Sequence, residues 1–405
     1  MRKASCWSVI LLILATIPLV AQGPDLNHMH AYPPIRVADA PADPGTPKGI
    51  LPVQFKAAYG FNRIPNLGQG QTIAIIDPYI DTHIEADLEY YLNYFHLEGC
   101  NLRQVPVGNP LPGAHGWDLE ISLDVEQACA LAPQATVILM EANSDSLADL
   151  LAAVQVATSA PYNATVVSMS WGYPEFQGEL ELDSYFCNIS NANGAVTFVA
   201  ASGDSGHQQV PFYPAASPCV IAVGGTTLVL STALPLANPL AFDYGNETTW
   251  NDSTGGISVF ENGTSWQDGI FAGCGSEGMR CIPDISSHSN PNPGVPVYDT
   301  YGYGGWVQVG GTSIASPDWA AFFTLVNSMR AEADPPKGTL SQAVQDLYAI
   351  YNSSAYLTDF HDITQGSNNG NCGAQCTPGP GYDLITGIGS YQANALATDL
   401  VGEPN

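Results

Sequence analysis

The chain has 405 residues with 38 acidic and 10 basic side chains, which gives a formal net charge of −28. This imbalance excludes a broad nucleic-acid-binding surface, because such a surface needs clustered lysine and arginine. Only 12% of the residues are charged whereas glycine and proline are abundant, a composition typical of a loop-rich extracellular domain.

Residues 1–21 have the composition of a secretory signal peptide. Arg2 and Lys3 give a basic start, and residues 9–20 form an apolar core that is too short to span a membrane comfortably. We expect cleavage after Ala21, with an uncleaved anchor as the alternative. No later stretch of the sequence is apolar for long enough to form a transmembrane helix. The sequence therefore predicts a secreted protein that has no membrane attachment once the signal is removed.

The next stretch, residues 22–49, is rich in proline, alanine and aspartate and is predicted to form a linker or tail. Beyond it, short apolar runs alternate with stretches of helical composition. The apolar runs span residues 72–76, 135–140, 165–170, 196–200 and 220–223. This alternation predicts an α/β fold in which a mostly parallel central sheet carries helices on both faces.

Asp77 follows the first apolar run, and His83 comes six residues later. An aspartate at a strand end resembles the aspartate of a subtilisin triad. Asp77 and His83 are therefore one candidate pair for the acid and base of a subtilisin-like peptidase.

Residues 117–132 carry two acidic side chains at a spacing that can support catalysis. Alternating apolar residues at the start of this segment favour a strand, whereas helix formers near its end favour a helix. In a helix, Glu120 and Asp124 lie one turn apart on one face and would share a proton, because two ionised carboxylates repel each other. Asp118 and Glu126 would point away as solvated or capping charges. An ordinary acidic helix face is the other interpretation.

Residues 309–317 are predicted to present a single serine. Two glycines before Thr312 allow a tight turn and a close approach to substrate, and Pro317 suits the first turn of a helix. Ser313 would lie just before that helix, where backbone N–H groups can bind developing negative charge. The segment resembles the nucleophile segment of the subtilisin-like superfamily. A turn that merely caps a helix is the alternative.

Nine cysteines become eight when Cys6 leaves with the signal peptide, and an even number suits disulfides in an oxidising compartment. Two local bridges are expected, Cys274–Cys281 and Cys372–Cys376. Two longer-range pairs are possible, Cys187–Cys219 and Cys100–Cys129. Sequence alone leaves this connectivity open. Zinc is the alternative for the Cys-x3-Cys pattern, but the remaining cysteines and histidines do not fall at zinc-finger spacings.

Taken together, the acidic segment and the serine segment resemble the sedolisin (serine-carboxyl peptidase) family, within the subtilisin-like superfamily. The resemblance covers residues 50–401 and implies a single subtilisin-like catalytic domain. It implies that Ser313 is the nucleophile, that Glu120 is the general base and that Asp124 is the partner of that base.

The same resemblance implies an aspartate in the oxyanion hole. Residues 195–201 form an apolar run that leads into the turn 202–206, which puts Asp204 at a strand end as the family requires. An aspartate donates a hydrogen bond only when it is protonated, and a carboxylate base works best in acid. We therefore expect an endopeptidase that is active in acid. Its expected substrate is a protein or peptide, and we expect the chain to be a monomer.

The C-terminal region resembles the calcium site of the family. Asp362 and Asp383 would supply carboxylates, and Ile363, Gly379 and Gly381 would supply backbone carbonyls to one structural calcium ion. Carboxylate and carbonyl oxygens are the ligands that this hard cation prefers, although a Gly-Pro-Gly turn can also occur without metal.

The resemblance also implies a large N-terminal prosegment that assists folding and blocks the site. The stretch between the predicted signal and residue 50 is much shorter than such a prosegment, so the means of silencing the enzyme during export is open. A catalytically silent secreted binding protein on a peptidase fold is the alternative from another functional class.

Overall fold

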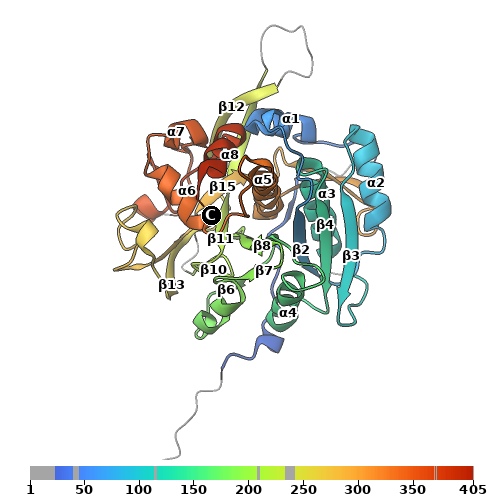
Figure 1. Ribbon diagram of the computed structural model, residues 1–405, viewed down its shortest axis with the longest axis horizontal. Helices are drawn as coiled ribbons and strands as arrows, with labels where there is room; N and C mark the ends of the chain where they lie inside the picture. The colour runs from blue at the N-terminus through green and yellow to red at the C-terminus, as the bar shows by residue number, and fades with distance from the viewer. Residues whose placement is uncertain are drawn as a thin grey trace, which may run out of the picture.

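The computed structural model describes residues 23–39, 45–113, 116–207, 210–232, 242–368, 370 and 372–404, and Figure 1 shows their arrangement. The predicted signal peptide and Cys6 lie outside these residues. Within the described ranges, none of the helices is both long and apolar enough to cross a membrane.

An eight-stranded sheet forms the centre of the fold (Figure 1). Seven strands follow the order β12–β11–β9–β5–β2–β4–β3, and β15 pairs with β11. Every pair is parallel except β11 with β12, and each of the five predicted apolar runs falls on one of these strands. The mostly parallel sheet is therefore confirmed. The strands are β2 (Thr72–Pro78), β3 (Asn101–Val107), β4 (Thr136–Ala142), β5 (Val166–Met169), β9 (Thr197–Ala201), β11 (Ile221–Thr232), β12 (Phe242–Thr249) and β15 (Ile285–His288).

Helices cover both faces of this sheet, as predicted. Alternate side chains of a strand point to opposite faces, so Ile73 and Ile75 of β2 join one core whereas Ala74 and Ile76 join the other. The helices α1, α2, α3, α5, α6 and α8 contribute buried residues to the first core, and α4 contributes buried residues to the second. The helices are α1 (Pro52–Tyr59), α2 (Ile84–Phe95), α3 (Trp117–Leu131), α4 (Leu147–Ala157), α5 (Thr312–Glu332), α6 (Ala343–Tyr351), α7 (Tyr356–Asp359) and α8 (Ala393–Gly402).

A second, three-stranded antiparallel sheet covers α3 from the side opposite the central sheet. It consists of β1 (Arg36–Val37), β17 (Gly305–Gly310) and β16 (Val295–Asp299). Its valines pack against Leu119 and Leu123, so α3 lies between two layers and all 15 of its residues are buried. Figure 1 shows α3 beside α5 in the middle of the molecule.

Short antiparallel pairs complete the strands: β6 (Tyr173–Pro174) with β10 (Phe212–Tyr213), β7 (Ser190–Asn191) with β8 (Gly194–Ala195), β13 (Gly256–Asn262) with β14 (Met279–Ile282), and β18 (Phe360–His361) with β19 (Ser390–Tyr391). Four disulfides join the eight cysteines of the described residues. They confirm the two expected local bridges and also the two longer-range pairs, Cys187–Cys219 and Cys100–Cys129.

Candidate active site

The acidic segment is a helix, α3, and not a strand. Glu120 and Asp124 therefore lie one turn apart on one face, and both side chains are fully buried. The expectation that Asp118 and Glu126 are solvated is wrong, because the three-stranded sheet covers their side of the helix. Glu126 is completely buried and accepts a hydrogen bond from the Tyr298 N–H at 3.1 Å.

Ser313 lies in the first turn of α5, one residue inside the helix and not just before it. Pro317 is also deeper than predicted, in the helix interior. A proline has no N–H group, so Pro317 cannot donate the usual helical hydrogen bond to the Ser313 carbonyl. The Ser170 hydroxyl donates a hydrogen bond of 3.4 Å to that carbonyl oxygen, in place of the missing backbone N–H.

The Ser170 hydroxyl also connects the nucleophile segment to the acidic pair. Ser170 directly follows β5, and its oxygen lies 2.9 Å from Asp124 Oδ1. The Ser313 hydroxyl lies beside Glu120 without a hydrogen bond of good geometry, and both Glu120 oxygens are buried without a partner in the described structure. The four side chains therefore form one buried group at the carboxyl end of β5.

Asp77, at the end of β2, adds a third carboxyl to the pair on α3. Its side chain is fully buried, neither oxygen has a hydrogen-bond partner among the described residues, and burial raises its pKa to about 8. Burial also raises the pKa of Glu120 well above its usual range, and the charge of Asp77 raises it further, while the Ser313 hydroxyl opposes the shift. The pKa of Asp124 is raised by burial and then by the charges of Asp77 and Glu120. Such a cluster holds its protons jointly.

The structure does not bring His83 to Asp77. The His83 ring is exposed, its Nδ1 lies 3.0 Å from Thr300 Oγ1, and it stacks edge-on against Tyr301. No hydrogen bond joins His83 to Asp77 in the described structure, so the geometry disfavours this pair as the acid and base.

Asp204 follows β9 and reaches the start of α5. Its Oδ1 accepts hydrogen bonds from the backbone N–H and the hydroxyl of Thr312, at 2.8 and 2.9 Å. Its Oδ2 is buried and has no partner among the described residues. Burial raises the pKa of Asp204 to about 7, although the Thr312 hydrogen bonds and the nearby Arg36 charge oppose this shift. In acid, Oδ2 can therefore carry a proton and donate it toward the Ser313 region.

The predicted calcium ligands lie on two loops that contact each other. Both Asp362 carboxylate oxygens accept from the Gly381 N–H at 3.1 Å, and Asp383 Oδ1 accepts from Ile385 and Thr386 N–H at 2.9 and 3.0 Å. Burial raises the pKa of Asp383 to about 7 and also raises the pKa of Asp362. The buried Asp383 and the partly buried Asp362 offer carboxylate oxygens of the kind that calcium prefers, and a bound cation would offset the cost of their burial.

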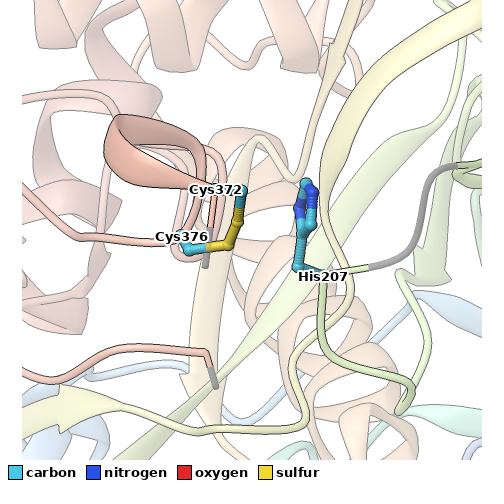
Figure 2. A group of neighbouring side chains, drawn as sticks. All are labelled: His207, Cys372 and Cys376. Carbon is cyan, nitrogen blue, oxygen red and sulfur yellow. A yellow bond between two sulfur atoms is a disulfide. The ribbon is translucent and has the colours of Figure 1, made fainter. Parts of the chain in front are cut away.

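Figure 2 shows a different group, in which His207 lies next to Cys372 and Cys376. Both sulfur atoms are joined in a disulfide, so neither is a thiolate that could bind zinc. Sulfur is also a poor ligand for calcium. This group is therefore not a metal site of the kind considered from the sequence.

Comparisons with known proteins show which sequences and structures this chain resembles. A sequence model of the subtilase family matches residues 124–368. The chain is 32% identical to kumamolisin of Bacillus sp. (strain MN-32), over 87% of this chain and 64% of that protein. It is 28% identical to sedolisin of Pseudomonas sp. (strain 101), over 92% of this chain and 65% of that protein. The chain thus spans slightly less than two thirds of these relatives.

A similar solved structure is that of Pseudomonas sedolisin, described as a serine-carboxyl proteinase complexed with two molecules of pseudo-iodotyrostatin. It superposes with a TM-score of 0.75 at 26% identity and covers 89% of this chain and 100% of that one.

Proposed function

The chain belongs to the subtilase family, in its sedolisin group, and on that premise we propose that it is a secreted serine-carboxyl endopeptidase that hydrolyses protein or peptide substrates in acid. The observation that carries this proposal is the buried contact of Ser170 with both Asp124 and the Ser313 carbonyl, beside Glu120. Within the described ranges, the Ser313 hydroxyl lies beside a buried carboxyl and has no hydrogen bond to a histidine, which suits a carboxylate base.

In this mechanism the Ser313 oxygen attacks the carbonyl carbon of the substrate while Glu120 accepts the hydroxyl proton. Asp124 shares that proton with Glu120, and Ser170 holds Asp124 in place. The carboxyls of Asp77, Glu120 and Asp124 interact, so they lose their protons one at a time as pH rises. Loss of the first proton already leaves one carboxylate in the cluster, and one carboxylate is sufficient as the base. A later return of the proton to the leaving amine completes acyl transfer to Ser313.

Asp204 supplies the hydrogen bond that stabilises the oxyanion of the tetrahedral intermediate. The fixed Oδ1 contacts with Thr312 orient Oδ2, which has no partner among the described residues, and a pKa of about 7 keeps that oxygen protonated in acid. A protonated acid placed in this way acts as an oxyanion donor. Above that pH, the ionised group would instead repel the developing negative charge.

Asp362, Asp383 and the carbonyl groups of Ile363, Gly379 and Gly381 would hold one calcium ion. Bound calcium would tie the two C-terminal loops together and would take no part in the chemistry. Secretion, with removal of residues 1–21, is supported by the four disulfides, which form in oxidising compartments. A monomeric state and a single catalytic domain over residues 50–401 complete the proposal.

The test is hydrolysis of an unfolded protein substrate across pH, with Ser313→Ala and a matched Ser316→Ala control. Ser316 is one turn away on α5 and contacts Ser168 at 2.9 Å instead of the acidic pair. We expect activity in acid that is abolished by the first substitution and retained with the second. Binding without hydrolysis at every pH would favour the silent binding protein.

A further inference from the structure

Residues 32–37 pass the start of α5 and show the register of a peptide backbone in the proposed site. The Ser313 N–H donates to the Pro34 carbonyl at 3.3 Å. Beyond that carbonyl, β1 pairs antiparallel with the end of β17, directly before the nucleophile segment. A backbone N–H of the nucleophile is a usual donor to the carbonyl of a bond about to be cleaved. Counted from this carbonyl, Arg36 lies where the second residue after the cleaved bond of a substrate would lie.

The guanidinium group of Arg36 is bound next to the proposed oxyanion donor. Its Nη2 donates to the backbone carbonyl of Asp204 at 2.7 Å. Burial raises the pKa of Asp204, the charge of Arg36 opposes this shift, and the charge of Asp252 adds to it. Both charged side chains are therefore close enough to the Asp204 turn to act on it.

Arg36 and Asp252 line the same cavity, which has a volume of about 290 Å³. Its other walls come from both ends of the passing segment and from two loops: Val37, Asp39, Trp250, Asn251, Asn290, Pro291 and Asn292. Apart from the passing segment, Asp252 is the only charged residue among the described residues of this lining. It forms no ion pair with any residue that the structure describes. The cavity therefore presents one uncompensated negative charge to the side chain that occupies it.

Asp252 is held beside the turn that carries Asp204. The Gly206 N–H donates to the Asp252 carbonyl at 2.7 Å, which ties the two segments together. A substrate side chain in the cavity thus meets the Asp204 carbonyl and the Asp252 carboxylate. A basic side chain can donate to the first and is attracted by the second, whereas an apolar one leaves the carbonyl without this donor and an acidic one is repelled.

We propose that the enzyme selects substrates with arginine or lysine as the second residue after the cleaved bond, and that the Asp252 carboxylate and the Asp204 carbonyl make this selection. The inference rests on the proposed function and names its substrate class as basic polypeptides. Arginine should be preferred to lysine, because a planar guanidinium with several N–H donors can serve the carbonyl and the carboxylate together.

Two analogues of arginine separate these contacts. Citrulline keeps the shape and the N–H donors of arginine without its charge, so it can still donate to the Asp204 carbonyl but is not attracted by Asp252. Norleucine has neither the charge nor the donors. The step from arginine to citrulline therefore measures the effect of Asp252, and the step from citrulline to norleucine measures the effect of the carbonyl.

The first test is a digest of unfolded proteins by the full chain in acid, with the cleaved bonds identified by mass spectrometry and Ser313→Ala as the control. We expect arginine and lysine at the second residue after the cleaved bond more often than their frequency in the substrates. Cleavage that depends on Ser313 but shows no such enrichment would overturn the inference and leave the proposed function intact. A chain that cleaves no bond would overturn both.

The second test measures kcat/KM for three peptides that share one sequence cleaved in the first test and carry arginine, citrulline or norleucine at the selected position. We expect kcat/KM to fall by about tenfold from arginine to norleucine, with citrulline between them, because a hydrogen bond from a charged group is lost. Added salt should lower the ratio of arginine to citrulline, since it screens the charge of Asp252.

Asp252→Asn should bring the arginine and citrulline peptides to nearly equal kcat/KM while the ratio of citrulline to norleucine is kept. The matched control is Asp243→Asn, an exposed aspartate on β12, which should change neither ratio. Circular dichroism checks that both variants keep the fold. An arginine-to-citrulline ratio that is the same in Asp252→Asn as in the wild type, or that does not respond to salt, would overturn the role of Asp252.

Discussion

Asp124 accepts a hydrogen bond from the Ser170 hydroxyl at 2.9 Å, and this contact joins α3 to the loop after β5. The same hydroxyl lies 3.4 Å from the Ser313 carbonyl, and its one proton serves one acceptor at a time. The contact favours the ionised form of Asp124, because it lowers a pKa that burial raises. We therefore expect Ser170 to position Asp124, so that its removal changes the pH dependence of the site.

Ser170→Ala should move the acid limb of the activity profile to higher pH by about one to two units, since a hydrogen bond to a charged group contributes about 1.5–3 kcal/mol. Without this donor, Asp124 holds its proton more strongly and the cluster ionises later. The measurement is kcat against pH, with Ser168→Ala as the control, because that buried serine contacts Ser316 instead of Asp124. A uniform loss at every pH would mean that Ser170 is only structural.

Glu120→Gln and Asp124→Asn should each lower kcat by about 10²–10⁴-fold, the usual contribution of general-base catalysis. The double variant should lose much less than the product of the two factors, because the carboxyls share one proton. Circular dichroism checks that the fold is retained. The matched control is Glu126→Gln on the opposite side of α3, whose amide oxygen can still accept from Tyr298 N–H. Near wild-type activity in either variant would exclude the pair as the base.

The positions of the central strands could be predicted because apolar runs are local signals, whereas the order of the strands in the sheet could not. For the acidic segment, a helix was one of two interpretations, and its four-residue spacing placed Glu120 and Asp124 on one face. Asp77 was predicted at a strand end but given the wrong partner, since only the sheet order brings β2 next to α3. The burial of Glu126 was missed for the same kind of reason. Its cover comes from β16, some 170 residues later, and no local pattern indicates that contact. The hydrogen bond from the Ser313 N–H to the Pro34 carbonyl, at 3.3 Å, is likewise one that no local pattern indicates.

The free energy of unfolding should fall as pH rises from about 4 to about 8. Aspartate has a pKa near 3.9 in an unfolded chain. In the folded protein burial raises the pKa of Asp77 to about 8 and of Asp204 to about 7. The folded state thus binds more protons across this range, so the stability present at low pH is lost as pH rises through the folded values.

Urea denaturation at several pH values, with a chelator present throughout, measures this dependence. Asp77→Asn should flatten the curve, because an amide has no proton to lose in this range. A stability that increases between about pH 4 and about pH 8 would contradict the raised pKa values.

Removal of the proposed calcium ion should lower the melting temperature at neutral pH. A ligand that binds only the folded state stabilises it by about 2.7 kcal/mol when its free concentration is 100 times Kd. Melting with calcium and with a chelator gives the difference. Asp383→Asn should abolish it, while its amide oxygen can still accept the Ile385 and Thr386 N–H groups. A wild-type melting temperature unchanged by chelator would mean that these loops form a plain turn.

Asp204 allows the sharpest comparison, because its role depends on a proton that asparagine does not need. Asp204→Ala removes the proposed oxyanion donor and should lower kcat by about 10²–10³-fold in acid, with KM less affected. Asp204→Asn keeps an N–H donor and an oxygen for Thr312, so it should retain more activity than the alanine variant. The wild-type donor ionises with a pKa of about 7, whereas the amide does not, so the asparagine variant should also keep its activity to higher pH. Profiles of kcat against pH for the three proteins make the test. If the alanine and asparagine variants have the same profile, Asp204 only fixes the Thr312 turn and the oxyanion is bound by other groups.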